Sequence, residues 1–460
     1  MGTQPETQQA SAQDKDFDRA FKLLQSLVDL REVDELFPQR AHTVFTASVV
    51  LWMLVFQRLK PDTSLENAVK HLLENRPAHL PENKRLREDK LSTNSGGYSK
   101  ARSRLPVNVV KWFADEICQG IVSTTDPTFN QRRVFLIDGT TIALAPEKEL
   151  QTIFPPASNQ HGEGVWPIAL LTVFHELSSG CALLPEVGAM YGENAVSETA
   201  LARRGLEKLP SGSIVMADAG FGIFGVAHEC DRQGHDFLFR MKKSNFNPLR
   251  QNATPVSEGP HHKTYRHTWI PTAKNRKTCP SVLQDTSLNV YLHEVQVTEG
   301  LTLYLVTSLE DDAWAAAGLF EKRYDVEIDI RNFKVVLGAE KIRAKSEDIF
   351  MKELWTSFVA YNLTSQFRRE AAKLNGVAPR RMSFKRTWTT FQTFLLGHLH
   401  TDAKSWREAF DTALRYAKQD KLPNRPGRHF KREAYRKRSK DVQFDKRTKP
   451  PSKITDTDLK

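Results

Sequence analysis

The chain is arranged around one amphipathic stretch, Leu319-Phe-Glu-Lys-Arg-Tyr-Asp-Val-Glu-Ile-Asp-Ile-Arg-Asn-Phe-Lys-Val-Val-Leu337. Successive residues of an α-helix lie about 100° apart around its axis, so each side chain can be assigned to a face. One face is an apolar stripe that predicts packing on a core; it contains Leu319, Val326, Ile330, Phe333 and Leu337. Beside it runs a stripe in which an acid lies between two bases; it contains Phe320, Arg323, Glu327 and Lys334.

Two upstream carboxylates bear on how this second stripe is interpreted. On the helix alone, solvated ion pairs at i,i+4 spacing explain it as well as a functional site does. However, Asp138 interrupts the apolar run 134–144, and Asp218 follows the apolar run 212–217. A carboxylate at the end of a buried strand costs several kcal/mol unless it is paired or bound to a metal. We therefore expect Asp138, Asp218 and Glu327 to meet in one site.

Three carboxylates indicate a particular kind of chemistry. Carboxylate oxygens suit hard divalent cations such as Mg²⁺ or Mn²⁺. Two such ions about 3.5–4 Å apart activate an attacking oxygen and stabilise a leaving one during phosphoryl transfer. The alternative for Asp138 and Asp218 is a structural role as turn-forming or helix-capping residues.

The composition describes a basic globular chain. Of its 460 residues, 40% are hydrophobic and 26% are charged, and the formal net charge is +11. Such a length allows two or more domains, and such a charge favours a polyanionic partner. The longest apolar run is too short to span a membrane, and the first residues do not have the pattern of a signal peptide. The four cysteines are scattered without a CxxC pair, which favours a reducing compartment and argues against structural zinc or disulfides.

Hydrophobic periodicity divides the chain into regions. Helical spacing dominates the first part, including residues 16–30; strands then alternate with helices, which predicts a mixed α/β sheet. A polar loop at 243–263 and alternating strands follow, then long helices and a Lys- and Arg-rich tail that is predicted to be disordered. The expected regions are a helical N-terminal region at 1–125, a core at 126–241 and 309–345, a β-rich insertion at 242–308, a helical C-terminal region at 346–422 and a basic tail at 423–460.

Several other side chains are candidates for DNA contacts. Tyr98, Lys100 and Arg102 lie in a short basic segment that can follow a nucleic-acid backbone, although a solvated basic helix face explains it too. Arg380 and Arg381 can neutralise phosphates in the same way. Elsewhere, Glu193 and Glu198 are expected to be exposed helix acids, with a supporting role near the site as the alternative. His175 is expected to be structural.

The motifs Asp138-Gly-Thr and Asp218-Ala-Gly-Phe-Gly, together with the helix that carries Glu327, resemble the DDE transposases of bacterial insertion sequences, in particular the IS-four type (Tn-five-like). That family's helix motif is Tyr, Arg, Glu and Lys, separated by two, three and six residues. It falls on Phe320, Arg323, Glu327 and Lys334 with its spacing intact. Phe320 replaces the family's Tyr, which puts a hydroxyl contact in doubt. The likeness covers residues 95–337.

The resemblance implies an RNase H-like core, which is a mixed sheet flanked by helices, with a β-rich insertion and helical terminal regions. It implies that Asp138, Asp218 and Glu327 are catalytic and hold two divalent cations, Mg²⁺ or Mn²⁺. It further implies DNA binding by the N-terminal region and through Phe320, Arg323 and Lys334. An aromatic side chain stabilises a flipped base in the family; Trp269 and Trp314 are the candidates here, with core packing as the alternative.

The implied activity is cut-and-paste transposition. Water cleaves the phosphodiester at the transposon end, a hairpin intermediate follows, and a freed 3′-OH attacks target DNA. The implied partners are double-stranded DNA, as terminal inverted repeats and target, and a second copy of the chain in a synaptic homodimer. A bacterial, cytoplasmic, nucleoid-associated protein is expected, without a membrane. The alternatives are a catalytically silent DNA-binding regulator and a two-metal nuclease; the presence of all three acids favours the active transposase.

Overall fold

The structure, a computed structural model, describes residues 31–38, 43–60, 64–75, 80–88, 90–159, 162–279, 281–283, 285–395 and 403–423. The predicted helix at 16–30 and nearly all of the predicted basic tail lie outside these residues.

Within the described residues, nine strands form one mixed sheet in the order β5-β4-β1-β6-β7-β11-β10-β9-β8. In its first half, β1 pairs in parallel with β6, and β6 with β7, whereas β4 is antiparallel to both β1 and β5. This mixed sheet flanked by helices confirms the predicted RNase H-like α/β core. The strands of this half are β1 (Val134–Ala143), β4 (Ile168–Glu176), β5 (Ala182–Ala189), β6 (Ile214–Ala217) and β7 (Asp236–Arg240).

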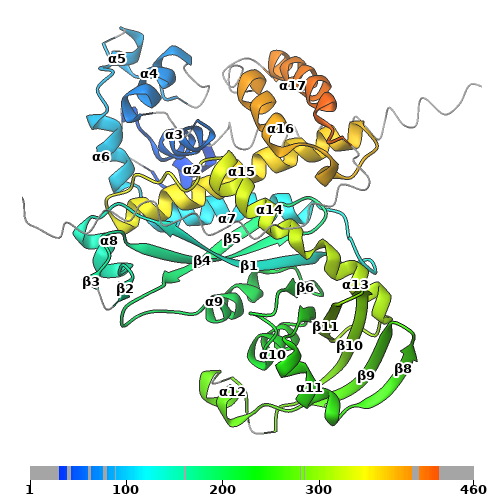
Figure 1. Cartoon of the computed structure of the whole chain (residues 1–460). Coiled ribbons are helices and arrows are strands. Elements are labelled where there is room, and N and C mark those ends of the chain that lie inside the picture. The colour runs from blue at the N-terminus through cyan, green and yellow to red at the C-terminus, as the bar shows by residue number, and fades with distance from the viewer. Residues whose placement is uncertain are drawn as a thin grey trace, which may run out of the picture. The chain divides into compact units, whose positions relative to one another are not determined.

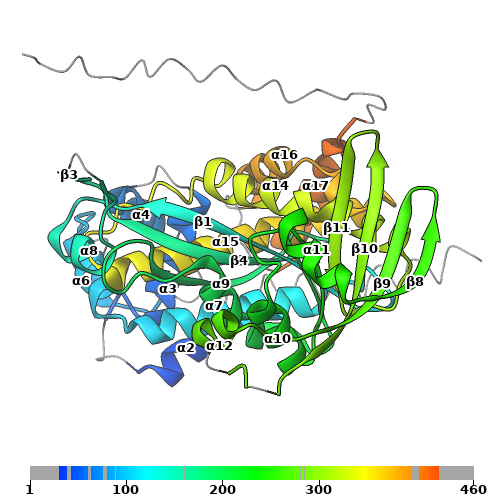
Figure 2. The ribbon, with the colours of Figure 1, turned by 60° about the horizontal axis from the view of Figure 1, so that its bottom comes forward.

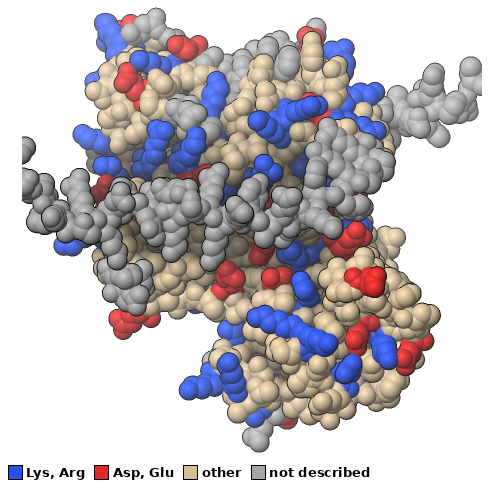
Figure 3. All heavy atoms as spheres, in the orientation of Figure 1, with Lys and Arg blue, Asp and Glu red and all other residues tan. Residues whose placement is uncertain are grey.

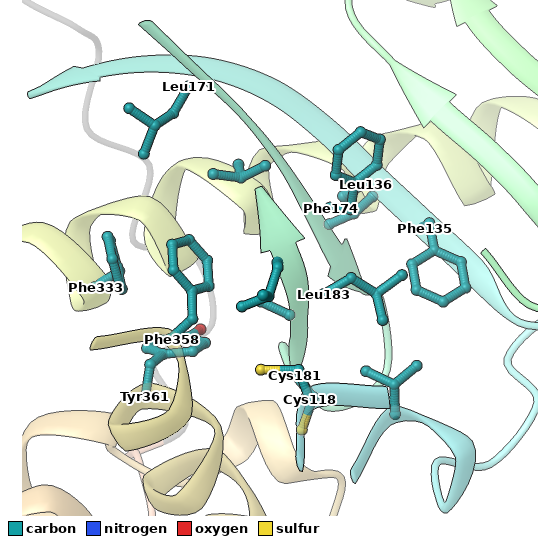
Figure 4. Close-up of a cluster of buried hydrophobic side chains, with 14 of the residues drawn as sticks. Cys118, Phe135, Leu136, Leu171, Phe174, Cys181, Leu183, Phe333, Phe358 and Tyr361 are labelled. Carbon is teal, nitrogen blue, oxygen red and sulfur yellow. The ribbon is translucent and has the colours of Figure 1, made fainter. Parts of the chain in front are cut away.

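Helices cover both faces of this half-sheet (Figure 1). On one side lie α7 (Val107–Ser123) and the long α15 (Glu347–Leu374), and on the other α9 (Glu198–Gly205) and α10 (Phe224–Arg232). Figure 4 labels buried side chains from the strands β1, β4 and β5 and from the helices α7 and α15, together with Phe333 and Cys181. All four cysteines are buried and have free thiols. Burying this apolar surface from both sides is the main stabilising term available to such a layered fold.

The residues predicted as a β-rich insertion continue the same sheet instead of forming a separate one. Strand β11 (Leu301–Thr307) pairs antiparallel with β7, and β10 (Leu288–Thr298), β9 (His262–Trp269) and β8 (Thr254–Gly259) follow outward. Figure 2 shows these strands as two hairpins at the end of the sheet.

The predicted polar loop at 243–263 is wrong, because the structure has the helix α11 (Lys243–Gln251) and the strand β8 there. The helix is anchored by one buried side chain, Phe246, whose ring lies 5.0 Å from that of Tyr304. Strand β8 is almost wholly exposed and contains Pro255, as edge strands tolerate. Strand β8 buries no apolar face, and α11 has only Phe246 and the partly buried Leu249 on its apolar face, which is too short a pattern for periodicity to indicate.

The stretch 319–337 is helical as far as Val336, but it is not one regular α-helix. It consists of the end of α13 (Ala313–Glu321), a 3₁₀ turn η2 (Lys322–Tyr324), α14 (Asp325–Arg331) and a π-helical turn η3 (Asn332–Val336). The predicted apolar stripe is confirmed: Leu319, Val326, Phe333 and Leu337 are buried, and Ile330 is partly buried against the core. The tight and wide turns redirect the polar side chains relative to an ideal helix.

The N-terminal helices are attached to α15 through buried polar contacts, which corrects two predictions. Tyr98 on α6 (Gly96–Arg104) is fully buried and donates its hydroxyl to Gln57 Oε1 at 2.8 Å. Arg102 pairs with the buried carboxylate of Glu353 at 3.0 Å, and Arg58 approaches the same carboxylate at 3.6 Å. The side chains of Tyr98 and Arg102 therefore join helices together, and the structure does not support a DNA contact for either.

Replacing Arg102 by Ala is expected to lower the free energy of unfolding by about 1–3 kcal/mol, because Glu353 would lose one partner of a buried carboxylate. The matched control is Arg104→Ala, which removes an exposed arginine two positions along the same helix and should change stability by less than about 0.5 kcal/mol. Urea denaturation checks both. Unchanged stability in Arg102→Ala, combined with weaker DNA binding, would restore the original prediction for Arg102.

A second expected outcome concerns the packing of α9 on β4. A Cβ at Gly205 would lie 2.2 Å from Cζ of the buried Phe174, so Gly205→Ala should destabilise the fold by about 1–3 kcal/mol. The same substitution at Gly318 in α13 meets no atom within 4 Å and should be neutral or stabilising by up to about 1 kcal/mol. Equal melting temperatures for the two variants would show that α9 is not tightly packed here.

Candidate active site

Parallel pairing of β1 with β6 brings two of the predicted acids together. Ile137 is the register partner of Ala217, so Asp138 and Asp218 are the next residues on neighbouring strands, which lie about 4.8 Å apart in a sheet. Strand β6 ends at Ala217, and each aspartate accepts a hydrogen bond of 2.8 Å from a following glycine N–H. The backbone thereby orients both carboxylates at the end of β6.

Glu327 is linked to this pair through Arg323. The Arg323 guanidinium donates to Glu327 Oε1 at 2.6 Å, and its other terminal nitrogen lies 3.9 Å from Asp138 Oδ2. Arg323 is largely buried, with 17% of its side chain exposed, whereas 39% of the Glu327 side chain is exposed. The cation is therefore placed between two of the three predicted acids.

Negative charge is concentrated around Asp138. The pKa of this carboxyl is raised to about 6, mainly by burial; the carboxylates of Asp218 and Glu198 contribute to the rise, and the Gly139 N–H and Arg323 oppose it. Partial burial and the Asp218 carboxylate also raise the pKa of Glu198. Like charges gathered in a partly desolvated place disfavour ionisation, and a bound cation would reverse that effect.

Glu198 is the residue that sequence reasoning placed on an ordinary helix surface. It opens α9, and its carboxylate lies against the backbone of Gly139, where an added Cβ would come within 2.3 Å of Glu198 Cδ and Oε1. A glycine directly after Asp138 was the only local signal, because it leaves room for this approach. Glu198 is exposed on α9, as expected, and its approach to Gly139 keeps the supporting role as a prediction.

The remaining members of the predicted stripe are placed differently. Lys334 lies in the π-helical turn and donates from Nζ to the carbonyl oxygen of Thr141 on β1 at 2.8 Å, so it reaches the strand that carries Asp138. Phe320 is 7% exposed and belongs to the core, so the structure does not support a DNA contact for its ring. Of the four residues of this stripe, Phe320 is therefore anchored in the core, whereas the polar side chains of Arg323, Glu327 and Lys334 are directed at the strands.

The donor set fits divalent cations in its chemistry, because it consists of carboxylate oxygens around a charge-crowded centre. In the described part of the chain, no three acidic, His or Cys side chains are grouped closely enough to hold a metal ion as they stand. The position of Arg323 gives the physical reason, since its guanidinium provides the positive charge between Asp138 and Glu327.

The other candidates for DNA contact have different surroundings. Lys100 is exposed on α6 and Arg381 is half-buried, so both stay predictions. Arg380 is paired with Asp325 and Asp329, and the structure does not support a phosphate contact for it. Figure 3 shows acidic and basic side chains lying next to one another over the region of α9 and β6.

The aromatic and histidine candidates can also be placed. Trp269 is buried, with its ring edge-on to Phe224, whereas Trp314 is 48% exposed and contacts His262. Of these two indoles, Trp314 is the accessible one. His175 is buried and donates from Nδ1 to the carbonyl of Gly180, and burial lowers its pKa, so a structural role as a neutral imidazole is the better interpretation.

A known protein family matches the part of the chain that carries this site. The family model described as "Transposase DDE domain" matches residues 129–363. No curated protein matches the chain. A solved structure described as a piggyBac transposase synaptic complex with hairpin DNA is similar with a TM-score of 0.41 and 11% sequence identity, over 89% of this chain and 86% of that one. Among the described residues, no helix is long and apolar enough to cross a membrane.

The match to the family model spans more than half of the 460 residues and includes Asp138, Asp218 and Glu327. The chain therefore belongs to the Transposase DDE domain family.

Proposed function

We propose that this chain is a transposase that performs cut-and-paste DNA transposition by two-metal phosphoryl transfer, as in the IS-four type. The observation that carries the proposal is the parallel pairing that sets Asp138 beside Asp218, with Arg323 linking Asp138 to Glu327. Membership of the family supports a transposase role in general. The roles of individual residues are inferred from the geometry of the site.

Asp138, Asp218 and Glu327 would hold two divalent cations, Mg²⁺ or Mn²⁺. Bound there, the cations supply activation of the attacking oxygen and stabilisation of the leaving one. In the first step, water forms a bond to phosphorus at the transposon end while the bond to the 3′-oxygen breaks, which leaves a 3′-OH. In the second step, that 3′-OH forms a bond to a target phosphorus and displaces another 3′-oxygen. In a hairpin route, the first 3′-OH forms a bond to a phosphorus of the opposite strand and displaces its 3′-oxygen, and water then opens the hairpin and frees the 3′-OH for the second step.

Arg323 and Lys334 would bind the terminal phosphate. Arg323 neutralises carboxylates in this structure, and cations between Asp138 and Glu327 would release its planar donors for a phosphate oxygen. Lys334 donates to a backbone carbonyl of β1, a neutral acceptor that a phosphate readily replaces. Trp314, exposed near these residues in sequence, is the better of the two indoles for stacking on a displaced base.

The partners proposed are double-stranded DNA, as terminal inverted repeats and as target, and a second copy of the chain in a synaptic homodimer. The net charge of +11 suits a polyanion whose binding weakens as salt increases. Within the proposed domain division, the N-terminal helical region and Lys100 assist in binding transposon ends, and 126–241 with 309–345 form the catalytic core. We propose the cytoplasm of a bacterium as the site of action.

Single replacement of Asp138, Asp218 or Glu327 by Ala is expected to lower the DNA cleavage rate by at least about 10³-fold, because each acid acts in one cooperative unit. The substrate is a supercoiled plasmid that carries the coding sequence with its flanking DNA, incubated in Mg²⁺ or Mn²⁺, and EDTA should abolish cleavage. Binding to the flanking DNA should persist. The matched control is Glu340→Ala, which removes an exposed acid for which no role in the site is proposed.

The same reactions distinguish the alternatives. Sequencing of the products should reveal ends joined to new positions; cleavage without joining would indicate a two-metal nuclease. Binding without any cleavage by the unmodified chain would indicate a silent regulator. Metal-dependent cutting retained in one of the three variants would remove that residue from the site.

Replacement of Arg323 or Lys334 by Ala is expected to slow hairpin formation or end processing by about 10²-fold, because each removes a donor to a phosphate that carries developing charge. Denaturing gels resolve nicked, hairpin and open ends over time. Lys322→Ala, an exposed cation next to Arg323, is the control and should process ends normally. Loss of the folded state in both Arg323→Ala and Lys334→Ala would instead assign them structural roles.

A further inference from the structure

The short helix α14 presents charged side chains on two opposite faces. Asp325 and Asp329 are four residues apart and share one face, whereas Glu327 lies two residues from each. Two residues correspond to a rotation of about 200°, so Glu327 projects from the other side of the helix. Asp329 is fully buried and 28% of the Asp325 side chain is exposed, so the face opposite Glu327 is packed into the protein.

One arginine binds both of these aspartates. Arg380, in the 3₁₀ turn η4 (Pro379–Arg381), donates from its two terminal nitrogens to the two carboxylate oxygens of Asp329 at 3.1 and 2.9 Å. Its Nε lies 3.3 Å from Asp325 Oδ2. A bidentate guanidinium pair fixes orientation as well as distance, because both partners are planar. We call these three side chains, Asp325, Asp329 and Arg380, the α14 clamp.

The α14 clamp is attached to the turn between β4 and β5. Arg380 also donates to the carbonyl oxygens of Leu177 and Glu176 in this turn. Gly180 in the same turn has φ +76°, and an added Cβ would lie only 2.7 Å from Asp329 Oδ1. The close approach of Asp329 to the turn therefore requires a glycine at this position.

The turn itself is held rigidly. The Glu176 carboxylate accepts hydrogen bonds from the backbone N–H and the hydroxyl of both Ser178 and Ser179. From α15, Arg368 donates to the Ser179 carbonyl and Tyr361 donates to the Gly180 carbonyl at 2.9 Å. So many hydrogen bonds leave the turn few alternative arrangements, and so it transmits position instead of absorbing it.

This network connects the two halves of the site. Strand β4 leads into the turn and pairs along its length with β1. Val173 on β4 is the register partner of Asp138 on β1. Charged groups buried this deeply add little net stability compared with apolar residues of the same size. A role in fixing geometry accounts for their presence, because α14 is short and lies between a 3₁₀ turn and a π-helical turn.

We propose that Arg380 is a positioning residue for the reaction: through Asp325 and Asp329 it sets the rotation of α14, so that Glu327 faces the strands that carry Asp138 and Asp218. The inference rests on the proposed function, because it assigns Glu327 a role at the reacting centre. It replaces the phosphate contact that the sequence predicted for Arg380.

The test uses Arg380→Lys in the full-length chain, which keeps the charge and loses the planar fork. A displacement of Glu327 by about 1 Å would lower the cleavage rate by about 10²-fold, while binding to flanking DNA stays unchanged. The second readout is amide hydrogen exchange without DNA or metal, in which residues 325–336 should exchange faster and strand β1 should not. The matched control is Arg386→Lys, the same substitution at an exposed arginine six residues along, which should behave as the unmodified chain does in both measurements.

The proposal for Arg380 is overturned if the Arg380→Lys variant cleaves DNA at the unmodified rate and its amides at 325–336 exchange at the normal rate. It is also overturned if the variant binds DNA more weakly without any change in amide exchange. If Arg380→Lys does not fold, Asp325→Asn replaces it, since this change leaves the pair between Arg380 and Asp329 intact and should give the same effects to a smaller degree. Cleavage by Glu327→Ala at the unmodified rate would contradict the proposed function and not the clamp, because the exchange measurement detects the clamp without any cleavage.

Discussion

Parallel pairing of β1 with β6 brings the carboxylates of Asp138 and Asp218 into one partly desolvated place, and charged residues of the surrounding structure are arranged around this pair. Asp138 and Asp218 follow register partners on neighbouring strands, and Glu198 lies against Gly139 close by. The raised pKa of Asp138 records the combined effect of burial and like charge. Replacing such a carboxylate by an apolar side chain would stabilise the fold, so the arrangement points to a function that needs concentrated negative charge.

Two arginines act on opposite sides of the helical stretch that completes the site. Arg323 contacts Glu327 and approaches Asp138 on the side of the strands, and Arg380 contacts Asp325 and Asp329 on the other side. Both side chains are 17% exposed, but the first is bound to carboxylates that cations would bind instead. The second is enclosed by carbonyl oxygens and a rigid turn. One is suited to change partners during a reaction, and the other is suited to stay in place.

Basic residues that look alike in sequence have different roles in the structure. Arg102 and Arg380 were expected to meet DNA, yet each is paired with a buried carboxylate contributed by a distant part of the chain, Glu353 for the first and Asp329 for the second. Lys100, next to Tyr98 and Arg102 in sequence, is exposed and stays available. A positive net charge therefore identifies the class of partner more securely than it identifies the contacting residues, because ion pairs over long sequence separations are invisible in a linear pattern.

The sequence by itself determined the mixed α/β core, most of its elements, and the spacing of Arg323, Glu327 and Lys334, because apolar periodicity and strand-ending acids are local properties of the chain. It also determined the buried face of the stretch 319–337. Only the tertiary structure decided that the predicted insertion extends the same sheet, that Phe320 and Tyr98 are core residues, and that Glu198 lies beside Asp138. The physical reason is that strand register, burial and long-range ion pairing depend on which surfaces meet, and that information is distributed over the whole chain rather than contained in any one segment.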